Sequence, residues 1–238
     1  MAGSVVFVLV ADELADAAAG QWGMFTTEQA HRLGLTSDQM AELGAAHRIS
    51  RTETPGVYRF AGVPVDVTLD ALRATWLSLD PAALAGERIA ALRSGGPGAI
   101  VSHVSAAHYV YELGTLHPAR LDYTVPAAPE ASSPRVEFHV AECWSPPWQL
   151  VGGLPVTPVP QTIADVYRDG IDGGHLGDIL RDVLARALAD VRVVAAELDP
   201  WASGQTGRDV VMHALAVVGA PASVAAGNEL LFSGVGGN

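Results

Sequence analysis

The sequence predicts an α+β protein in which a small N-terminal unit of helices and a hairpin precedes a mixed α/β domain that ends in helices. Three observations support this prediction. Two short helices with N-terminal caps are joined through a glycine, a proline-glycine turn joins the two strand-like runs that follow, and strand-like and helical segments then alternate. The apolar fraction of 49% is large enough to bury a substantial core.

The first helices follow from apolar periodicity and from capping residues. Residues 8–20 have the periodicity of a helix that ends in a glycine-rich turn. Thr26 and Gln29 form a capping box that begins a short second helix, and Thr36 and Gln39 form an equivalent box for a third. A glycine between these two helices permits a sharp turn. Met40 and Leu43 of the third helix are three residues apart on one face and are expected to be core.

A hairpin is expected directly after the third helix. Residues 49–52 and 57–60 have strand-like composition, and Pro55-Gly56 between them marks a tight turn. Two capped helices joined by a turn and followed by such a hairpin predict a winged helix-turn-helix over residues 1–66. In that arrangement the second helix of the pair enters the major groove of DNA.

Residues 67–218 are expected to form the mixed α/β domain, and residues 219–238 a tail for which no structure is predicted. The expected strands are 99–101, 121–125, 136–140 and 154–159. The last strand is placed at a sheet edge because it contains Pro155 and Pro158. The expected helices are 69–79, 82–92, 102–113, 161–168, 176–189, 191–198 and 209–218.

The composition excludes several classes of function. All fourteen basic residues are arginine, so no mechanism that needs a lysine is possible, such as a phosphate-loop lysine or a Schiff base. A net charge of −12 argues against a general polyanion binder. Within residues 20–62, however, four arginines balance four acidic residues, so the excess of acid lies outside this window.

The single cysteine and the apolar segment near the N-terminus indicate the cellular compartment. Cys143 is the only cysteine, which excludes a disulfide within the chain and a thiolate metal cage. The apolar run at residues 5–10 lacks a basic flank and is too short to span a bilayer, so it is expected to begin a helix. We therefore expect a reduced, cytoplasmic protein with no membrane partner.

Five segments, taken in their order along the chain, resemble one family. They are QWGMFTTEQA (21–30), PGVYR (55–59), LRATWLSL (72–79), VSHVSAA (101–107) and GLPVTP running on to TIAD (153–165). The pattern covers about residues 11–189 and resembles the AbiEi-type antitoxins of type IV toxin–antitoxin systems. The resemblance implies a repressor of its own toxin–antitoxin operon. It also implies a nucleotidyltransferase-like toxin that the protein opposes without forming a stable complex.

The second helix of the pair supplies the predicted base contacts. Ser37, Asp38 and Gln39 occupy its N-terminal end, which reads base edges in a winged helix-turn-helix. Gln39 could bond an adenine edge with both amide atoms, and Asp38 could accept from cytosine. Alternatively, Gln39 acts only as the capping partner of Thr36, and the sequence favours neither role over the other.

Other residues are predicted to hold the DNA backbone. Thr27, with the amides at the start of its helix, could bind a phosphate. Arg48, Arg51 and Arg59 flank the hairpin and could grip phosphates or enter the minor groove. Arg51 and Arg59 could also be plain solvated residues. The expected partner is double-stranded DNA, namely the chain's own promoter with repeated half-sites, and three or four phosphate contacts predict a salt slope of about −3 to −4.

Two other classes of function remain open. The acidic residues Asp38 and Glu42 on the third helix favour a winged helix that binds protein instead of DNA. A nuclease in the second domain is the other class, although the lack of lysine and of a tight carboxylate cluster weighs against it. No serine-hydrolase or dinucleotide-binding glycine motif is present, so we expect no enzyme activity and no cofactor.

The spacing of the histidines does not predict a metal site. His103 and His108 are five residues apart and do not share a helix face, while His117 and His139 have no partner at ligand spacing. His103 is expected at a helix start with a backbone hydrogen bond, after Ser102 as the cap. The acidic series Asp165, Asp169 and Asp172 is expected to be solvated surface.

Overall fold

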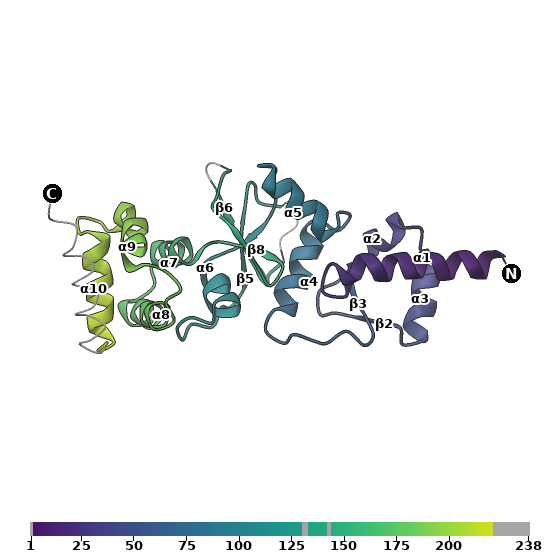
Figure 1. Cartoon of the computed structure of the whole chain (residues 1–238), viewed down its shortest axis with the longest axis horizontal. Coiled ribbons are helices and arrows are strands. Elements are labelled where there is room, and N and C mark those ends of the chain that lie inside the picture. Colours follow the sequence, from purple (N-terminus) through teal and green to yellow (C-terminus); the bar gives the residue numbers. More distant parts are fainter. Residues whose placement is uncertain (1, 130–132, 142–143, 221–238) are drawn as a thin grey trace. The chain divides into compact units, whose positions relative to one another are not determined.

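The computed structural model describes residues 2–129, 133–141 and 144–220, so Cys143 and most of the predicted tail lie outside the described residues. The protein is α+β, with two separate sheets. Its contacts divide the chain into unit 1 (Met1–Ala99) and unit 2 (Ile100–Asn238) (Figure 1). No helix in the described ranges is both long enough and apolar enough to cross a bilayer.

Unit 1 combines helices with a three-stranded antiparallel sheet of order β1-β3-β2. Its elements are α1 (Ala2–Ala19), β1 (Met24–Thr26), α2 (Thr27–Arg32), α3 (Ser37–Ala45), β2 (Ile49–Arg51), β3 (Val57–Phe60), α4 (Asp70–Leu79) and α5 (Ala85–Arg93). The hairpin β2–β3 follows the pair α2–α3 as the sequence predicts. Strand β1 was not predicted, because its three residues acquire strand structure only by pairing with β3.

One hydrophobic core holds α1, α2, α3 and the sheet together. Its buried members are Leu14, Ala18, Phe25, Ala30, Leu35, Met40, Leu43 and Ile49. Phe25 stacks on Tyr58 with ring centroids 5.7 Å apart, which joins β1 to β3 across the sheet. Met40 and Leu43 are buried as expected, so one side of α3 faces the core and the opposite side is left to solvent.

The boundary between the units lies later than the one predicted at residues 66 and 67. Helices α4 and α5 belong to unit 1 because polar side chains tie them to the N-terminal elements. Arg59 of β3 forms an ion pair with Asp70 of α4 (2.5 Å), and Oε1 of the buried Gln21 side chain accepts from the Ala85 amide of α5 (3.0 Å). These contacts join residues far apart in sequence, so local patterns could not reveal them.

Unit 2 contains a mixed five-stranded sheet of order β6-β5-β4-β8-β7 and a set of C-terminal helices. Its elements are β4 (Ile100–Val101), α6 (His103–Ser105), the π-helix η1 (Ala106–Val110), β5 (Leu121–Val125), β6 (Val136–Val140), β7 (Gln149–Val151), β8 (Leu154–Val156), α7 (Val159–Arg168), α8 (Gly173–Ala185), α9 (Val191–Leu198), the 3₁₀ helix η2 (Asp199–Trp201) and α10 (Gly207–Val217). The expected helix at 102–113 is therefore a short α-helix that continues as a π-helix.

The expectation that residues 154–159 form an edge strand is wrong. Strand β8 lies between β4 and β7, and β7 was not predicted. The pairing with β4 runs through Val156, opposite Val101, and through the Thr157 amide, which donates to the Val101 carbonyl (3.0 Å). This short ladder does not use the amide position of Pro155, and Pro158 lies beyond the strand at the start of α7.

The turn after β4 contains two buried polar side chains, those of Ser102 and His103. Ser102 does not cap the helix, because its hydroxyl is hydrogen-bonded to His103 Nδ1 (2.8 Å) and accepts from Thr124 (2.9 Å). The His103 ring thus bonds to a side chain and not, as expected, to the backbone. Burial lowers the pKa of His103 to about 2, and the positive charges of His139 and Arg168 add to this effect.

The acidic series on and after α7 is not the uniform solvated surface that was expected. Asp165 is only 4% exposed, and burial raises its pKa to about 6, although Gln161 donates a hydrogen bond to it (2.9 Å). Asp172 caps α8 by accepting from the amides of Gly174 (2.9 Å) and His175 (3.1 Å).

Candidate nucleic-acid interface

Both predicted capping boxes of unit 1 are present and set the start of α2 and α3. Thr26 accepts from the Gln29 amide (3.0 Å), and Gln29 accepts from the Thr26 amide (3.0 Å). Thr36 and Gln39 exchange the same pair of bonds at 3.2 and 2.8 Å. These reciprocal bonds satisfy backbone donors that a helix start leaves free, so the turn between α2 and α3 is well determined.

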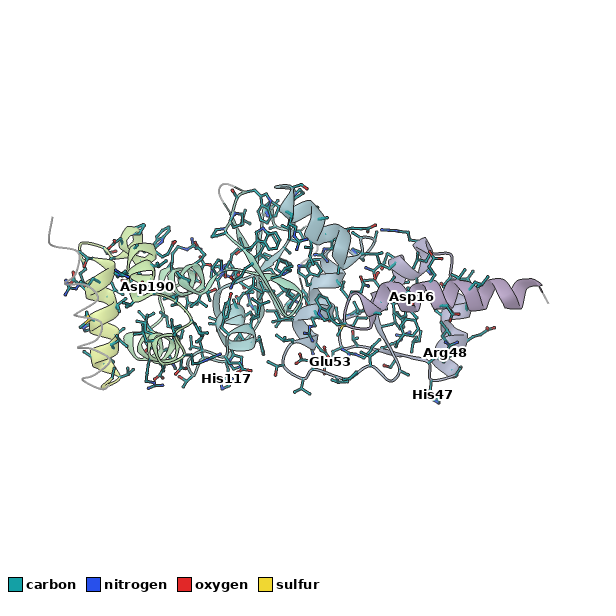
Figure 2. The ribbon with its side chains drawn as sticks, viewed as in Figure 1. Asp16, His47, Arg48, Glu53, His117 and Asp190 are labelled. Atoms are coloured by element: carbon teal, nitrogen blue, oxygen red, sulfur yellow. The ribbon has the colours of Figure 1, made fainter. Side chains whose placement is uncertain are left out.

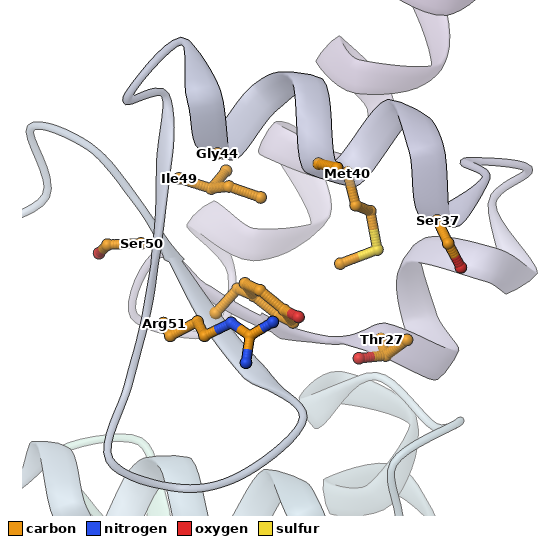
Figure 3. A pocket seen from close by; sticks show the side chains of 9 residues that line it. Thr27, Ser37, Met40, Gly44, Ile49, Ser50 and Arg51 are labelled. Atoms are coloured by element: carbon orange, nitrogen blue, oxygen red, sulfur yellow. The ribbon is translucent and has the colours of Figure 1, made fainter.

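A cavity of 350 Å³ lies between α3 and the hairpin β2–β3 (Figure 3). Helix α3 lines it with residues three and four apart on one face: Ser37, Met40, Ala41 and Gly44. The remaining lining residues are Thr27 of α2, Ile49, Ser50 and Arg51 of β2, and Tyr58 of β3. The cavity exists because three of the four α3 residues have short side chains.

Three of the predicted DNA-contacting residues meet at this cavity. Ser37, at the start of α3, is exposed, and Arg51 reaches toward the cavity from the hairpin (Figure 3). Thr27 also lines it, but its amide (2.9 Å) and its hydroxyl (3.3 Å) both donate to the Gly56 carbonyl. The amide of Thr27 is therefore engaged by the hairpin turn and is not a free phosphate donor.

Two further predicted residues of α3 lie next to the cavity without lining it. Asp38 is exposed, whereas Gln39 is half-buried and its side-chain oxygen accepts from the Thr36 amide (2.8 Å). A bidentate contact with adenine needs that oxygen, so Gln39 would have to give up its capping bond to make it. The capping role, which the sequence left as an alternative, is the one the structure shows.

Arg59 is not part of the exposed surface, which contradicts its predicted role as a hairpin arginine. It is 8% exposed, forms an ion pair with Asp70 (2.5 Å) and donates to the Pro64 carbonyl (2.8 Å). Alternation along a strand explains the difference, since neighbouring β3 residues point to opposite sides of the sheet and the side of Arg59 is covered by α4.

Two of the three predicted hairpin arginines remain exposed. Arg48 follows α3 and is exposed (Figure 2), and the Arg51 guanidinium lies 5.9 Å from the centroid of the Tyr58 ring. Within the described residues, neither arginine forms an ion pair. By contrast, Arg32 pairs with Glu87 (2.5 Å), and this hydrogen-bonded guanidinium lowers the pKa of Glu87 to about 2.

The sequence analysis did not identify all residues of the cavity. Ala41, Gly44, Ser50 and Tyr58 were not among the predicted contacts, and Met40 was assigned only to the core. The spacing of Ser37, Met40, Ala41 and Gly44 is the signal that could have found the α3 side, since positions three and four apart share a helix face. The hairpin side depends on strand register and has no comparable signal.

Alanine substitutions at Gly44 and Gly34 separate two effects on stability. One is the backbone conformation of the glycine, and the other is the space available for the added Cβ. Gly44 is inside α3, and a Cβ added there meets no atom within 4 Å. Gly44→Ala is therefore expected to raise the free energy of unfolding by about 0.5–1 kcal/mol in urea denaturation, because alanine favours the helix. Gly34→Ala is the matched control, since it also enters open space but has φ +97° and should destabilise. A loss of stability in Gly44→Ala would contradict the packing described for α3.

Comparisons with known proteins assign neither a family nor a function to the chain. No family model and no curated protein sequence matches the chain. The chain is similar to the crystal structure of the RV2827C protein from Mycobacterium tuberculosis, with 16% sequence identity and a TM-score of 0.48. That alignment covers 93% of this chain and 81% of the other. The function is therefore inferred from the residues of this chain.

Proposed function

We propose that unit 1 is a winged helix-turn-helix that binds double-stranded DNA, and that the chain regulates transcription of its own operon. The observation that carries this proposal is the shared cavity, because Ser37 of α3 and Arg51 of the hairpin, both exposed, border the same concave surface. A helix beside a hairpin arginine can place side chains in the major groove and a cation on an adjacent phosphate or in the minor groove.

The charges on this surface set the expected affinity. Arg48 and Arg51 are the cations available for phosphates, and exposed acids nearby oppose them: Glu28, Asp38, Glu42 and Glu53. Two phosphate contacts at about −0.9 each give a slope of log affinity against log salt of about −2. This is shallower than the sequence-based expectation because Arg59 is buried. One unit should bind weakly, and two units on repeated half-sites should bind better.

Fluorescence anisotropy with a duplex from the chain's own promoter tests this function. The full chain is titrated at several salt concentrations, together with the double variant Arg48→Ala/Arg51→Ala. We expect a slope of about −2 per unit for the wild type and loss of salt-sensitive binding in the variant. Arg93→Ala is the matched control, since Arg93 is an exposed arginine of unit 1 on α5, outside the cavity lining.

The outcomes separate DNA binding from general charge effects. Salt-sensitive binding that survives in Arg93→Ala and disappears in the double variant supports the proposed interface. Absence of salt-sensitive binding at low ionic strength would refute DNA binding by unit 1. Equal binding by the double variant and the wild type would place the contact elsewhere on the chain.

An antitoxin role is the second part of the proposal, and it is supported by the sequence resemblance. The partner would be a nucleotidyltransferase-like toxin from the same operon, opposed without a stable complex. Co-expression with the neighbouring open reading frame tests this role. Growth inhibition by the neighbour that the chain relieves supports it, and a harmless neighbour or unrelieved toxicity contradicts it.

A protein-binding module is the alternative function, and the four exposed acids of α2, α3 and the hairpin favour it. A basic protein surface would pair with these acids, while a DNA backbone would be repelled by them. The Arg48→Ala/Arg51→Ala variant discriminates between the two, because it should lose DNA binding under the first function and keep partner binding under the second.

A further inference from the structure

Three potential metal ligands from separate segments meet in unit 2. His103 follows β4, His139 is on β6, and Asp169 is the residue after α7. One ligand atom from each side chain lies within 4.8 Å of the other two. We propose that His103, His139 and Asp169 form a binding site for a divalent first-row transition-metal ion, most simply zinc.

The distance between the His103 and Asp169 ligand atoms is close to that of a tetrahedral site. His103 Nε2 lies 3.7 Å from Asp169 Oδ2, and the His103 and His139 rings are stacked with centroids 3.4 Å apart. With zinc–ligand bonds of about 2.0–2.2 Å, neighbouring ligand atoms of a tetrahedron lie about 3.3–3.5 Å apart. An ion bound by all three side chains therefore requires the Asp169 carboxylate, which is 44% exposed, to move inward. It also requires one of the two stacked imidazoles to turn so that its ring nitrogen faces the ion.

Hydrogen bonds from other side chains orient both imidazoles. Ser102 Oγ is bonded to His103 Nδ1 (2.8 Å), which leaves the Nε2 of that ring facing Asp169. His139 Nε2 lies 3.1 Å from a carboxylate oxygen of Asp122, whose other oxygen accepts from the Ser105 hydroxyl (2.9 Å). Histidines that bind metals are nearly always held in this way through a second polar partner.

The backbone and the exposure of the cluster also fit a ligand site. His103 has φ +51°, an uncommon conformation for a residue with a side chain, and it is 1% exposed. Such conformations cost free energy and concentrate at functional sites. The exposed Asp169 opens one side of the cluster to solvent, so water can occupy a remaining coordination position. Two histidines and one carboxylate with an open position are a common ligand set for zinc and iron.

Arg168 is the group that opposes a metal ion. Its Nη2 lies 3.4 Å from His103 Nε2, where a cation would be repelled. The Arg168 side chain is 41% exposed, and its guanidinium also lies 5.2 Å from the centroid of the Trp201 ring. Metal binding therefore requires Arg168 to turn toward solvent, and removal of this charge should strengthen binding.

Zinc titration of the full chain against a chromophoric chelator tests the site. We expect one zinc ion per chain, and a loss of affinity of more than about 100-fold in His139→Gln and in Asp169→Asn, since even an outer partner contributes about 10–100-fold. Arg168→Ala should bind zinc about tenfold more tightly or better. His117→Gln is the matched control, because His117 is an exposed histidine of the same unit that contacts His108.

A check of folding and a second metal ion make the zinc titration a test that can refute the proposed site. His139 and Asp169 are partly exposed, so both variants should fold, which circular dichroism verifies. Cobalt(II) provides a second readout, as its visible absorption reports nitrogen and oxygen ligands directly. The proposal is overturned if the wild type binds no zinc, if either ligand variant binds like the wild type, if His117→Gln alone abolishes binding, or if Arg168→Ala binds more weakly.

Discussion

Arg59→Ala is expected to lower the free energy of unfolding by about 3 kcal/mol, measured by urea denaturation. Removing one member of a buried ion pair costs about 3–5 kcal/mol because the other charge is left without its partner. The lower value applies here, since Asp70 keeps a second, longer contact with Arg73 (3.4 Å). The Pro64 carbonyl also loses its donor.

Two comparisons make this result specific to the buried ion pair. Arg93→Ala, at an exposed arginine of the same unit, should change stability by no more than about 0.5 kcal/mol. The double variant Arg59→Met/Asp70→Leu should recover most of the loss, because it removes both charges together. If Arg59→Ala instead keeps wild-type stability and loses only DNA affinity, then Arg59 is an exposed hairpin residue and the ion pair described above is wrong.

Gly207→Ala is expected to destabilise unit 2 by about 3 kcal/mol, the upper end of the range for overpacking. Gly207 is the first residue of α10, and a Cβ there would lie 1.9 Å from the Ala195 carbonyl oxygen of α9. The obstacle is backbone, which cannot move aside like the end of a side chain. Helix α8 also approaches α10 closely, since a Cβ on Gly177 would lie 2.3 Å from the Ala214 carbonyl oxygen.

Gly173→Ala is the matched control for this effect. Gly173 is the first residue of α8, and a Cβ there meets only Val217 at 3.8 Å, an ordinary contact. It should therefore leave the free energy of unfolding within about 0.5 kcal/mol of the wild type. Equal stability of Gly207→Ala and Gly173→Ala would show that α9 and α10 do not pack at this distance.

Local patterns in the sequence were sufficient for the pair α2–α3 and for the hairpin. The capping residues Thr26 and Thr36 each bond to a residue three positions later, Gln29 and Gln39. Pro55-Gly56 turns the chain within four residues. These are interactions between neighbours, so the sequence contains all of their partners. The same holds for Met40 and Leu43, whose burial follows from helical spacing.

The candidate site could be predicted only in part. Ser37 and Arg51 border the same cavity, and their positions on the helix and the hairpin are local properties that the sequence could supply. The burial of Arg59 was missed because its partner Asp70 is on a helix that the sequence assigned to the second domain. The proposed metal site was not predicted for the same reason, since His103, His139 and Asp169 come from three separate segments.

By itself the sequence determined where helices and turns begin, because caps, glycines and apolar spacing act over one or two turns of chain. Only the tertiary structure decided which charges are free and which are neutralised. That outcome depends on burial and on partners far away in the chain: Asp70 takes Arg59 out of the exposed surface, while Arg48 and Arg51 remain in it. The electrostatic free energy of an ionised side chain is set by its solvent exposure and its nearest opposite charge, and neither is a property of the local sequence.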